Sequence, residues 1–338
     1  MSAASGCYFV PYEELGDTPN IVVDGAASSA TAITLSHWPK SGTLPALKAD
    51  TSAEIVFIYL DSPAFHVAAN AVSNNHFDED GLIGLFTLIE PNAAMGMRDL
   101  LIDAAHAGDF ATYQDRHAAR IAFTVSAFAD PDTSPLDRVI FDMPYAEQCA
   151  ALYREILPRF GEIAGNTDRF RNYWEREDRV LEDSERAIRD GRVTIREIPG
   201  VDLAVVTVPE NQAASTVHKF TSASKTLCHP MAIHNATRCN RVLTVQGRQY
   251  SFRYRYESWV QYMTAAIPPR VDLTPLAAEL TGDEPNGAVW TFEGVSEITP
   301  ALTLSDGSDS AISPESFQAR LVAFLESAPP AWNPYDPS

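Results

Sequence analysis

Basic residues are scarce in this sequence of 338 residues. It contains 25 lysines and arginines against 45 aspartates and glutamates, which gives a formal net charge of −20 at pH 7. A field of this sign repels long nucleic acids, because their phosphates carry the same charge. Acidity of this degree also keeps a protein soluble whatever its function. The composition therefore favours a small-molecule substrate and gives no support to long nucleic acid as a partner.

Long apolar runs, a leader pattern and cysteine pairs are missing as well. No window approaches the roughly 18 apolar residues of a membrane span. The opening residues, MSAASGCYFVPYEELGDTP, lack the basic and apolar blocks of a secretory signal. Neither a disulfide framework nor a zinc knot is indicated, since no C-x-x-C pair links Cys7, Cys149, Cys228 and Cys239. We expect reduced thiols, a cytoplasmic location and no membrane partner.

The order of the expected elements indicates an α/β fold. Short apolar strands alternate with helices: strands at 20–25, 31–39 and 69–77, and helices at 50–60, 81–89 and 93–110. Strands interleaved with helices predict a mostly parallel sheet flanked by helices, whose functional groups gather at the carboxyl ends of the strands. Asp24, His37 and His76 lie at such ends.

The pattern changes beyond Pro131. A strongly charged helix at 166–191 carries an incomplete apolar stripe, and the chain after it is rich in strands, with a hairpin turning at Gln246-Gly247. A chain of this length exceeds the usual size of one core. We therefore predict an N-terminal α/β domain (1–165), a linking helix (166–192) and a smaller α+β substrate-binding domain (193–338).

The most informative stretch is His-Phe-Asp-Glu-Asp-Gly at 76–81. In an extended segment His76, Asp78 and Asp80 would project to one side, and Gly81 would permit a sharp turn into the next helix. Such groups cannot share a low-dielectric pocket cheaply unless cations neutralise them, so the motif indicates a metal site. The alternative is a solvated acidic cap on the following helix. A calcium loop is disfavoured by the spacing and by the histidine.

Three segments resemble motifs of the DHH phosphoesterase superfamily. NNHFDEDGLIGLFTL resembles its first motif, an H-x-D-x-D-G segment at a strand end before a helix, and NIVVDG resembles its second, a strand that ends in a metal-binding aspartate. ITLSHWPKSGTLPALKADTSAEIVFIYL resembles its third, although the family's triplet reads Ser36-His37-Trp38 here. The motifs stand in a permuted order, so the resemblance is to a diverged member, or to an uncharacterised family of its own.

This resemblance implies an enzyme that uses two metal ions, commonly manganese, to hydrolyse phosphodiesters, phosphoanhydrides or short oligonucleotides. A mixed set of histidines and carboxylates suits Mn²⁺, Fe²⁺ or Zn²⁺ better than Ca²⁺. Two such ions, roughly 3.5 to 4 Å apart, activate a water for in-line attack on phosphorus. The implied metal ligands are Asp24, His37, His76, Asp78, Asp80 and Asp109. Among them, the implied catalytic residues are His76, Asp78 and Asp80. Asp103 and His106 are alternatives to Asp109 as the sixth ligand.

A basic patch at 218–241 interrupts the acidic sequence. Arginine and lysine clamp phosphate or carboxylate groups, so His229 and Arg238, together with Lys40 after the third motif, are the predicted substrate contacts. An ordinary loop with surface cations is an equally weighted alternative. A separate metal site made of His218, His229 and His234 matches no ligand spacing that we recognise.

We therefore expect a divalent-metal-dependent, phosphoesterase-like hydrolase that acts on a small phosphorylated substrate or a short nucleotide. The sequence leaves a homodimer open. It also leaves open a metal-dependent enzyme of another reaction type, such as amide hydrolysis or a tailoring step, because Trp38 replaces a histidine that contacts phosphate in the family. A third alternative is a non-catalytic binding protein with a decayed site.

Overall fold

The computed structural model describes residues 6–219, 222–305 and 307–336, which pack as two compact units. The first unit is formed by the residues up to Val180 together with Thr216–Lys225 and Tyr262–Thr264. The second is formed by Leu181–Ser215, Thr226–Gln261 and the residues from Ala265 onward. Two short segments from late in the chain thus belong to the first unit. The domain boundaries expected near 165 and 193 stay predictions.

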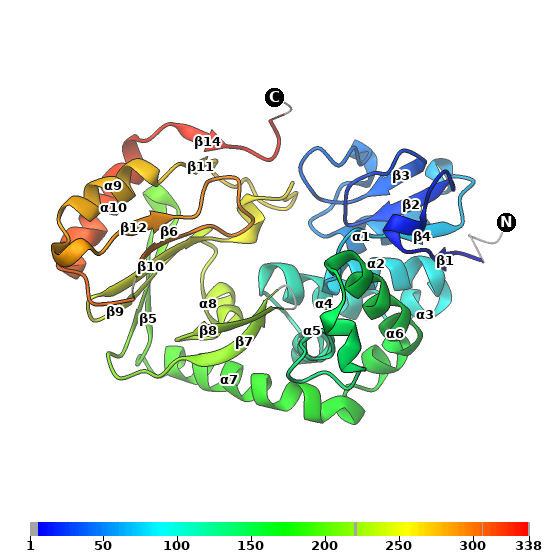
Figure 1. Cartoon of the computed structure of the whole chain (residues 1–338), viewed down its shortest axis with the longest axis horizontal. Coiled ribbons are helices and arrows are strands. Elements are labelled where there is room, and N and C mark those ends of the chain that lie inside the picture. The colour runs from blue at the N-terminus through cyan, green and yellow to red at the C-terminus, as the bar shows by residue number, and fades with distance from the viewer. Residues whose placement is uncertain (1–5, 220–221, 306, 337–338) are drawn as a thin grey trace. The chain divides into compact units, whose positions relative to one another are not determined.

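The first unit contains a four-stranded sheet in the order β1-β4-β2-β3 (Figure 1). Its strands are β1 (Tyr8–Phe9), β2 (Asn20–Val23), β3 (Thr31–Leu35) and β4 (Ala71–Ser73). Each neighbouring pair runs parallel. Strand β2 is buried along its whole length, as a central strand covered on both faces must be. Because parallel strands end at the same edge, the residues that follow β2, β3 and β4 meet there.

Helices fill the rest of the first unit. They are α1 (Ser52–Leu60), α2 (Glu79–Ile89), α3 (Pro91–Met95), α4 (Arg98–Phe110), α5 (Arg116–Ala129), α6 (Tyr145–Gly165) and the first part of α7 (Arg171–Arg189). Helices α1 and α2 pack on the sheet and on each other, and α4 packs between α2 and α5 (Figure 1). Helix α2 is buried over nearly all of its residues, which explains why its sequence is apolar on every side.

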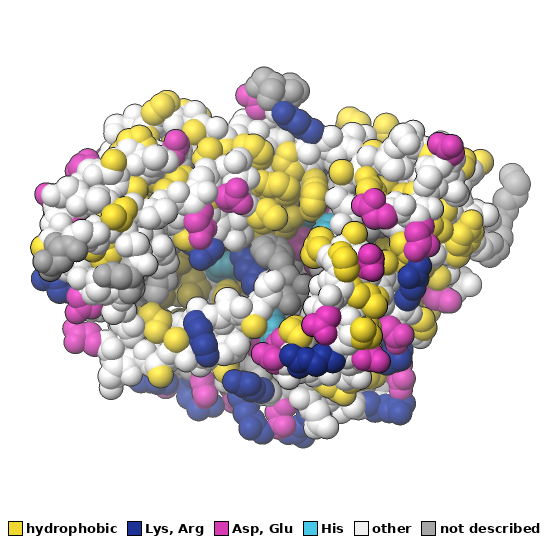
Figure 2. Space-filling view, viewed as in Figure 1, with side chains coloured by type: hydrophobic (Ala, Val, Ile, Leu, Met, Phe, Trp, Pro, Cys, Tyr) yellow, Lys and Arg dark blue, Asp and Glu magenta, His cyan; other side chains and the backbone are white. Residues whose placement is uncertain are grey.

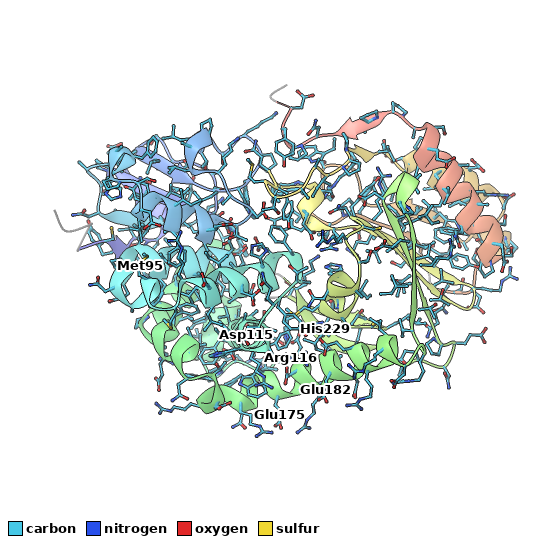
Figure 3. All side chains as sticks on the ribbon, turned by 180° about the vertical axis from the view of Figure 1, so that it is seen from behind. Met95, Asp115, Arg116, Glu175, Glu182 and His229 are labelled. Carbon is cyan, nitrogen blue, oxygen red and sulfur yellow. The ribbon has the colours of Figure 1, made fainter. Side chains whose placement is uncertain are left out.

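Helix α7 carries charge of both signs. Glu175 accepts from Arg171 and Arg179 at 2.7 and 2.6 Å, and Glu182 accepts from Arg186 at 3.1 Å, all with i,i+4 spacing (Figure 3). Figure 2 shows the resulting mixture of blue and magenta side chains along the edge where α7 runs. The helix begins after a short 3₁₀ turn at Thr167–Phe170, so the expected linking helix is shorter than 166–192.

The second unit is built on a six-stranded sheet in the order β12-β13-β10-β9-β6-β5. Strands β6 and β9 run parallel and the other neighbours antiparallel. The strands are β5 (Thr194–Ile198), β6 (Leu203–Val208), β9 (Arg241–Gln246), β10 (Gln249–Tyr254), β12 (Trp290–Phe292) and β13 (Ala301–Leu304). The hairpin between β9 and β10 turns through Gly247 and Arg248, one residue later than the pattern predicted. Gly247 has a φ of 54°, which such a turn requires.

The remaining elements are helices α8 (Pro230–Ala236), α9 (Thr274–Gly282) and α10 (Pro314–Ser327), the paired strands β7 (Ser215–Lys219) and β8 (Ser222–Thr226), and the paired strands β11 (Arg270–Val271) and β14 (Pro330–Trp332). The α/β class predicted from the sequence is confirmed. All four cysteines are free and buried. Among the described helices, none combines the length and apolarity needed to cross a membrane.

Candidate metal centre

Asp24 occupies the end of the central strand β2 in an unusual backbone conformation. Its φ is 50°, in the left-handed region that residues other than glycine seldom adopt. Its N–H donates to the Leu35 carbonyl at 3.0 Å, and its side chain is 1% exposed. A buried carboxylate held at a strained position marks a candidate functional residue.

His37 follows β3 and is completely buried. Its Nδ1 lies 2.5 Å from the carbonyl oxygen of Asp50, which can only accept, so Nδ1 carries the hydrogen and Nε2 carries the lone pair. Burial lowers the pKa of His37, which keeps the ring neutral. Nε2 faces three carboxylates, at 3.5 Å from Asp24 Oδ1, 3.5 Å from Asp109 Oδ2 and 3.8 Å from Asp80 Oδ2.

The His-Phe-Asp-Glu-Asp stretch contributes three residues to the same place. His76 Nε2 lies 3.0 Å from Asp78 Oδ2 and 3.3 Å from Asp24 Oδ2. The expected extended segment is wrong: Asp78 is the N-cap of α2, where it accepts from the Gly81 N–H at 2.9 Å, and Asp80 lies in the first helical turn. The helical cap still turns all three side chains toward the site. The acids are also buried, so they are no solvated cap.

The two intervening residues, Phe77 and Glu79, have their partners elsewhere. Phe77 packs edge-on against Tyr153 at 4.8 Å. Glu79 is bonded to the Ser126 hydroxyl. Burial raises the pKa of Glu79 to about 7, a shift that the bond to Ser126 opposes and the charge of Asp78 reinforces. Glu79 is therefore a neighbour of the site without facing its centre.

The N-terminus of α1 supports two of the acids. The Ser52 and Ala53 N–H groups donate to the two oxygens of Asp80, each at 2.7 Å. The Ser52 hydroxyl donates to Asp24 Oδ1 at 2.8 Å. Free N–H groups and the helix dipole favour negative charge at such an end. The sequence indicated the helix, but nothing in it singled out Ser52 as a partner of these acids.

Asp109 reaches the site from α4. Neither of its carboxylate oxygens accepts a hydrogen bond from any described residue, although both are buried. The competing candidates lie elsewhere: Asp103 accepts from the Gln114 and Asp115 N–H groups at 2.8 to 3.0 Å, and His106 packs against the Phe110 ring. The geometry thus brings Asp109, and not Asp103 or His106, to the other ligand candidates.

Burial and mutual repulsion govern the ionisation of these acids. Burial raises the pKa of Asp80 and Asp109 well above the usual range, and the neighbouring carboxylates raise both further. Burial and the charge of Asp24 also raise the pKa of Asp78. Burial would raise the pKa of Asp24 too, but the hydrogen bond and charge of His76 outweigh it and lower that pKa to about 2. His76 is held protonated, because its carboxylate partners outweigh burial and raise its pKa.

The residues fit divalent cations. Asp24, His76 and Asp78 form one group and Asp24, His37 and Asp80 a second, and within each group one candidate ligand atom per residue lies within 4.8 Å of the others. Ligand atoms bound to one cation at 2.0 to 2.2 Å lie about 3 to 3.6 Å apart. A cation would also neutralise acids that the described residues leave without a full counter-charge. A histidine and carboxylate set of this kind suits Mn²⁺, Fe²⁺ or Zn²⁺.

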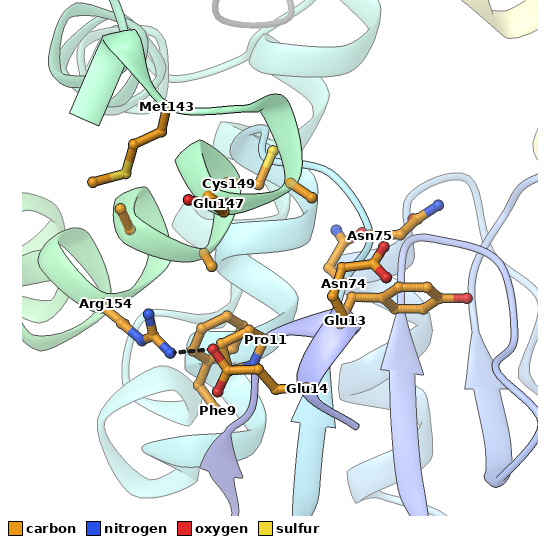
Figure 4. A pocket seen from close by; sticks show the side chains of 14 residues that line it. Phe9, Pro11, Glu13, Glu14, Asn74, Asn75, Met143, Glu147, Cys149 and Arg154 are labelled. Atoms are coloured by element: carbon orange, nitrogen blue, oxygen red, sulfur yellow. Dashed lines mark hydrogen bonds and ion pairs between the residues drawn. The ribbon is translucent and has the colours of Figure 1, made fainter. Parts of the chain in front are cut away.

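A cavity of about 360 Å³ is lined by Asn74 and Asn75, which directly precede His76, although none of the candidate ligands lines it (Figure 4). Asn74 Oδ1 accepts from the His76 N–H at 3.1 Å. The lining combines apolar and acidic residues, and its one cation, Arg154, is paired with Glu14 at 2.7 Å. A pocket of this size holds a small molecule.

Gly81 serves a purpose other than the predicted turn. It lies inside α2 with an ordinary helical backbone. A Cβ at this position would stand 2.2 Å from Asn74 Nδ2 and 2.8 Å from the Tyr153 hydroxyl, so one or both of these side chains would have to move. Glycine therefore lets the Asn74 side chain pack directly against the helix.

The three predicted substrate contacts are not brought together by any described contact, and they stay predictions. Lys40 is exposed in the loop after β3, with a φ of 58°. His229, labelled in Figure 3, belongs to the second unit, where it is buried and its Nδ1 caps α8 by accepting from the Met231 N–H at 3.1 Å. Arg238 is an exposed loop residue of the same unit.

Comparison with known proteins places the chain in a family without giving it an activity. No curated protein and no solved structure matches it. Residues 5–336 match the model of a family of unknown function (DUF6687), and the chain belongs to that family.

Proposed function

We propose that this protein is a divalent-metal-dependent hydrolase, phosphoesterase-like, that acts on a small phosphorylated substrate or a short nucleotide. One observation carries the proposal: two histidine and carboxylate groups at the carboxyl edge of a parallel sheet, buried except for the half-buried His76, share Asp24. In two-metal hydrolases the ions lie roughly 3.5 to 4 Å apart, and a carboxylate common to both groups would hold two ions that close together. The resemblance of the three motifs to DHH phosphoesterases supports the choice of a phosphoester.

Asp24 faces both halves of the centre. Its Oδ1 lies 3.5 Å from His37 Nε2, and its Oδ2 lies 3.3 Å from His76 Nε2. Asp24, His76 and Asp78 would hold one cation. Asp24, His37 and Asp80 would hold the second, with Asp109 beside them. Bound divalent cations supply Lewis acidity and lower the pKa of a coordinated water, so no side-chain nucleophile is required.

The surrounding residues orient these groups and shape the substrate site. The hydrogen bond to Asp50 fixes the His37 ring, and the N-terminus of α1 fixes Asp80. The Trp38 ring stacks on the His76 ring with centroids 4.9 Å apart. The cavity beside Asn74 and Asn75 would accept the rest of the substrate. Its acidic lining disfavours additional anionic groups, so a substrate with one phosphoryl group on an uncharged body fits it best.

A second candidate function keeps the metals but changes the bond that is cleaved. Trp38 stands where DHH phosphoesterases carry a histidine that contacts phosphate. An indole offers one neutral N–H donor, whereas a protonated imidazole offers a charge. Hydrolysis of an amide, which carries less negative charge than a phosphoester, is compatible with this substitution.

The test is a substrate panel combined with one matched pair of variants. Wild-type protein supplied with Mn²⁺ should hydrolyse generic phosphomonoesters or phosphodiesters in preference to amides. Asp78→Asn keeps the cap of α2, because asparagine caps helices well, yet should lower both bound Mn²⁺ and activity by at least about 100-fold. Asp115→Asn is the matched control, because Asp115 is the N-cap aspartate of α5 and is not a candidate ligand (Figure 3). This variant should keep both the bound Mn²⁺ and the activity of wild type.

Three results would count against the proposal. Full metal content in a folded Asp78→Asn variant would remove the centre from its assigned place. Activity on amides alone would favour the second candidate, and tight Mn²⁺ binding without turnover of any substrate would favour a binding protein.

A further inference from the structure

Asp50 connects the metal centre to a distant part of the chain. Its carbonyl oxygen accepts from His37 Nδ1 at 2.5 Å. Its carboxylate accepts three hydrogen bonds from the 262–264 segment of the first unit: from the Met263 N–H at 2.5 Å, from the Thr264 N–H at 3.0 Å and from the Thr264 hydroxyl at 2.5 Å. The residue is 2% exposed.

We propose that Asp50 is a positioning residue of the metal centre, and that the 262–264 segment sets metal affinity through it. The inference rests on the proposed function for its metal, because a cation is what the oriented imidazole would bind. Asp50 touches no predicted substrate and is not itself a ligand. It acts by fixing which nitrogen of His37 carries the hydrogen.

The chemistry of the ring makes this orientation decisive. A neutral imidazole has one nitrogen that donates and one that can bind a metal. A hydrogen bond from Nδ1 to a carbonyl selects the form in which Nε2 is the ligand and also makes that nitrogen more basic. His37 Nε2 faces Asp24, Asp80 and Asp109. Only this tautomer presents a lone pair to a cation placed among those acids.

The position of the Asp50 carbonyl is fixed from two sides. On one side Thr51 caps α1, with its hydroxyl accepting from the Glu54 N–H at 3.2 Å. On the other side the Asp50 carboxylate is tied to Met263 and Thr264. If the second attachment were lost, the peptide before the helix cap would gain freedom to rotate its carbonyl away from His37.

A ring contact joins the same segment to a second ligand. The Tyr262 ring packs edge-on against the Phe110 ring at 5.2 Å, and Phe110 directly follows Asp109. Phe110 also lies 6.1 Å from the His37 ring. The 262–264 segment therefore supports two of the candidate ligands, through Asp50 and through Phe110. Metal binding and seating of the segment are coupled, and by linkage each must favour the other.

The experiment measures metal affinity and the His37 tautomer separately in the full-length chain. Calorimetric titration with Mn²⁺ should show that Asp50→Ala binds about 10- to 100-fold more weakly than wild type, the range typical of lost partners of a metal ligand. Thr264→Ala, which removes one exposed hydroxyl, should bind about 3- to 10-fold more weakly. Thr264→Ser keeps the hydroxyl and should restore wild-type affinity.

The tautomer is read without metal from two-bond ¹H–¹⁵N correlation spectra, with the His37 signals assigned by their loss in His37→Gln. Wild type and Thr264→Ser should show the form with hydrogen on Nδ1, and Asp50→Ala should show a mixture. A purely structural role for Asp50 would lower stability without changing the tautomer. Thr274→Ala is the matched control, because Thr274 donates to the Asp272 carboxylate at 2.6 Å in the second unit.

The inference is overturned if a folded Asp50→Ala variant keeps both the wild-type tautomer and the wild-type Mn²⁺ affinity. If Asp50→Ala does not fold, an unchanged affinity in Thr264→Ala overturns it instead. If wild type binds no Mn²⁺, the proposed function fails, whereas the tautomer spectra still decide whether Asp50 positions His37.

Discussion

Arg270 in the second unit and the aspartate cluster in the first both place ionisable side chains in the protein interior. They differ in what offsets the unfavourable free energy of burial. Arg270 is 0% exposed and donates to the Ser258 hydroxyl at 2.8 Å and to the carbonyls of Val295, Glu297 and Ile298 at 2.5 to 3.0 Å. Burial lowers the pKa of Arg270 to about 10, so it remains charged at neutral pH. The protein alone satisfies this cation.

The cluster in the first unit is not satisfied in the same way. Asp109 receives no hydrogen bond from the described residues, and burial together with neighbouring charge raises the pKa of Asp78, Asp80 and Asp109. An unpaired buried charge destabilises a fold unless something outside the chain compensates it. Arg270 is thus satisfied by hydrogen bonds within its own protein, whereas the carboxylates of the proposed metal centre are left for a cation to neutralise, as the proposed function requires.

Arg270→Met gives the largest expected effect on stability and tests the first half of this comparison. The substitution removes four hydrogen bonds made by a fully buried guanidinium, so the free energy of unfolding should fall by about 3 to 5 kcal/mol in urea titrations. Arg253→Met is the control, because Arg253 is exposed and has a single described bond, to the Thr299 carbonyl. The loss of unfolding free energy in Arg253→Met should stay below about 1 kcal/mol. An equal loss in the two variants would show that the buried hydrogen bonds of Arg270 contribute no more than the exposed bond of Arg253.

His218 in the first unit is an ionisable side chain whose charge is balanced by two acids of the protein itself. The free energy of unfolding should therefore depend on its titration. His218 donates to Glu177 at 2.5 Å and to Asp130 at 2.8 Å. These two acids outweigh burial and raise the pKa of His218 to about 9. The stabilisation is therefore complete below the ordinary histidine value of about 6.5 and is lost as the pH rises through about 9.

The measurement is the free energy of unfolding between pH 6 and 10 for wild type and His218→Gln. Wild type should be more stable by about 1 to 2 kcal/mol at pH 6, after allowance for partial exposure, and the advantage should vanish by pH 10. A constant difference across this range would show that His218 contributes packing and not charge.

Asp109→Asn should give the smallest effect on stability and one of opposite sign. Burial and the neighbouring acids raise the pKa of Asp109, so wild type must either bury a charge at this position or take up a proton when it folds. Asparagine removes that cost, so the free energy of unfolding of the metal-free variant should be about 1 kcal/mol higher than that of wild type. With Mn²⁺ present, wild type should be more stable than Asp109→Asn, because wild type binds the ion more tightly and binding stabilises the folded state. Thermal unfolding with and without Mn²⁺ measures both. A variant that is less stable than wild type without metal would show that the acids are satisfied by the protein itself.

The sequence predicted where the candidate ligands lie along the strands and helices, because strand ends and helix starts are local features; their role as ligands stays a prediction. Asp24 and His37 follow short apolar runs that are β2 and β3, and Asp78 precedes the apolar run of α2. Convergence at one edge follows from parallel pairing. The reason given for grouping His76, Asp78 and Asp80 was wrong, since a helix cap and not an extended strand turns them together.

Partners far apart in the chain could not be predicted. The alternating charges of the stretch Asp115-Arg-His-Ala-Ala-Arg120 are typical of a solvated helical face, and the stretch does begin helix α5. Yet Arg116 and Arg120 both pair with the distant Asp178, at 2.6 and 3.0 Å. Asp50 looks like an ordinary residue before a helix cap. Its partner Met263 is 213 residues away, and no local pattern encodes such a pairing.

The attachment of Asp50 to residues 263 and 264 has a consequence for protein synthesis. Every candidate ligand emerges from the ribosome within the first 109 residues, long before the segment that steadies His37 is translated. A nascent or truncated chain therefore carries the acids and imidazoles without the contacts that orient His37, and on the proposed function it should bind cations only weakly. Metal loading would then wait until residues 262–264 have been translated, which would protect an immature chain from trapping the wrong ion.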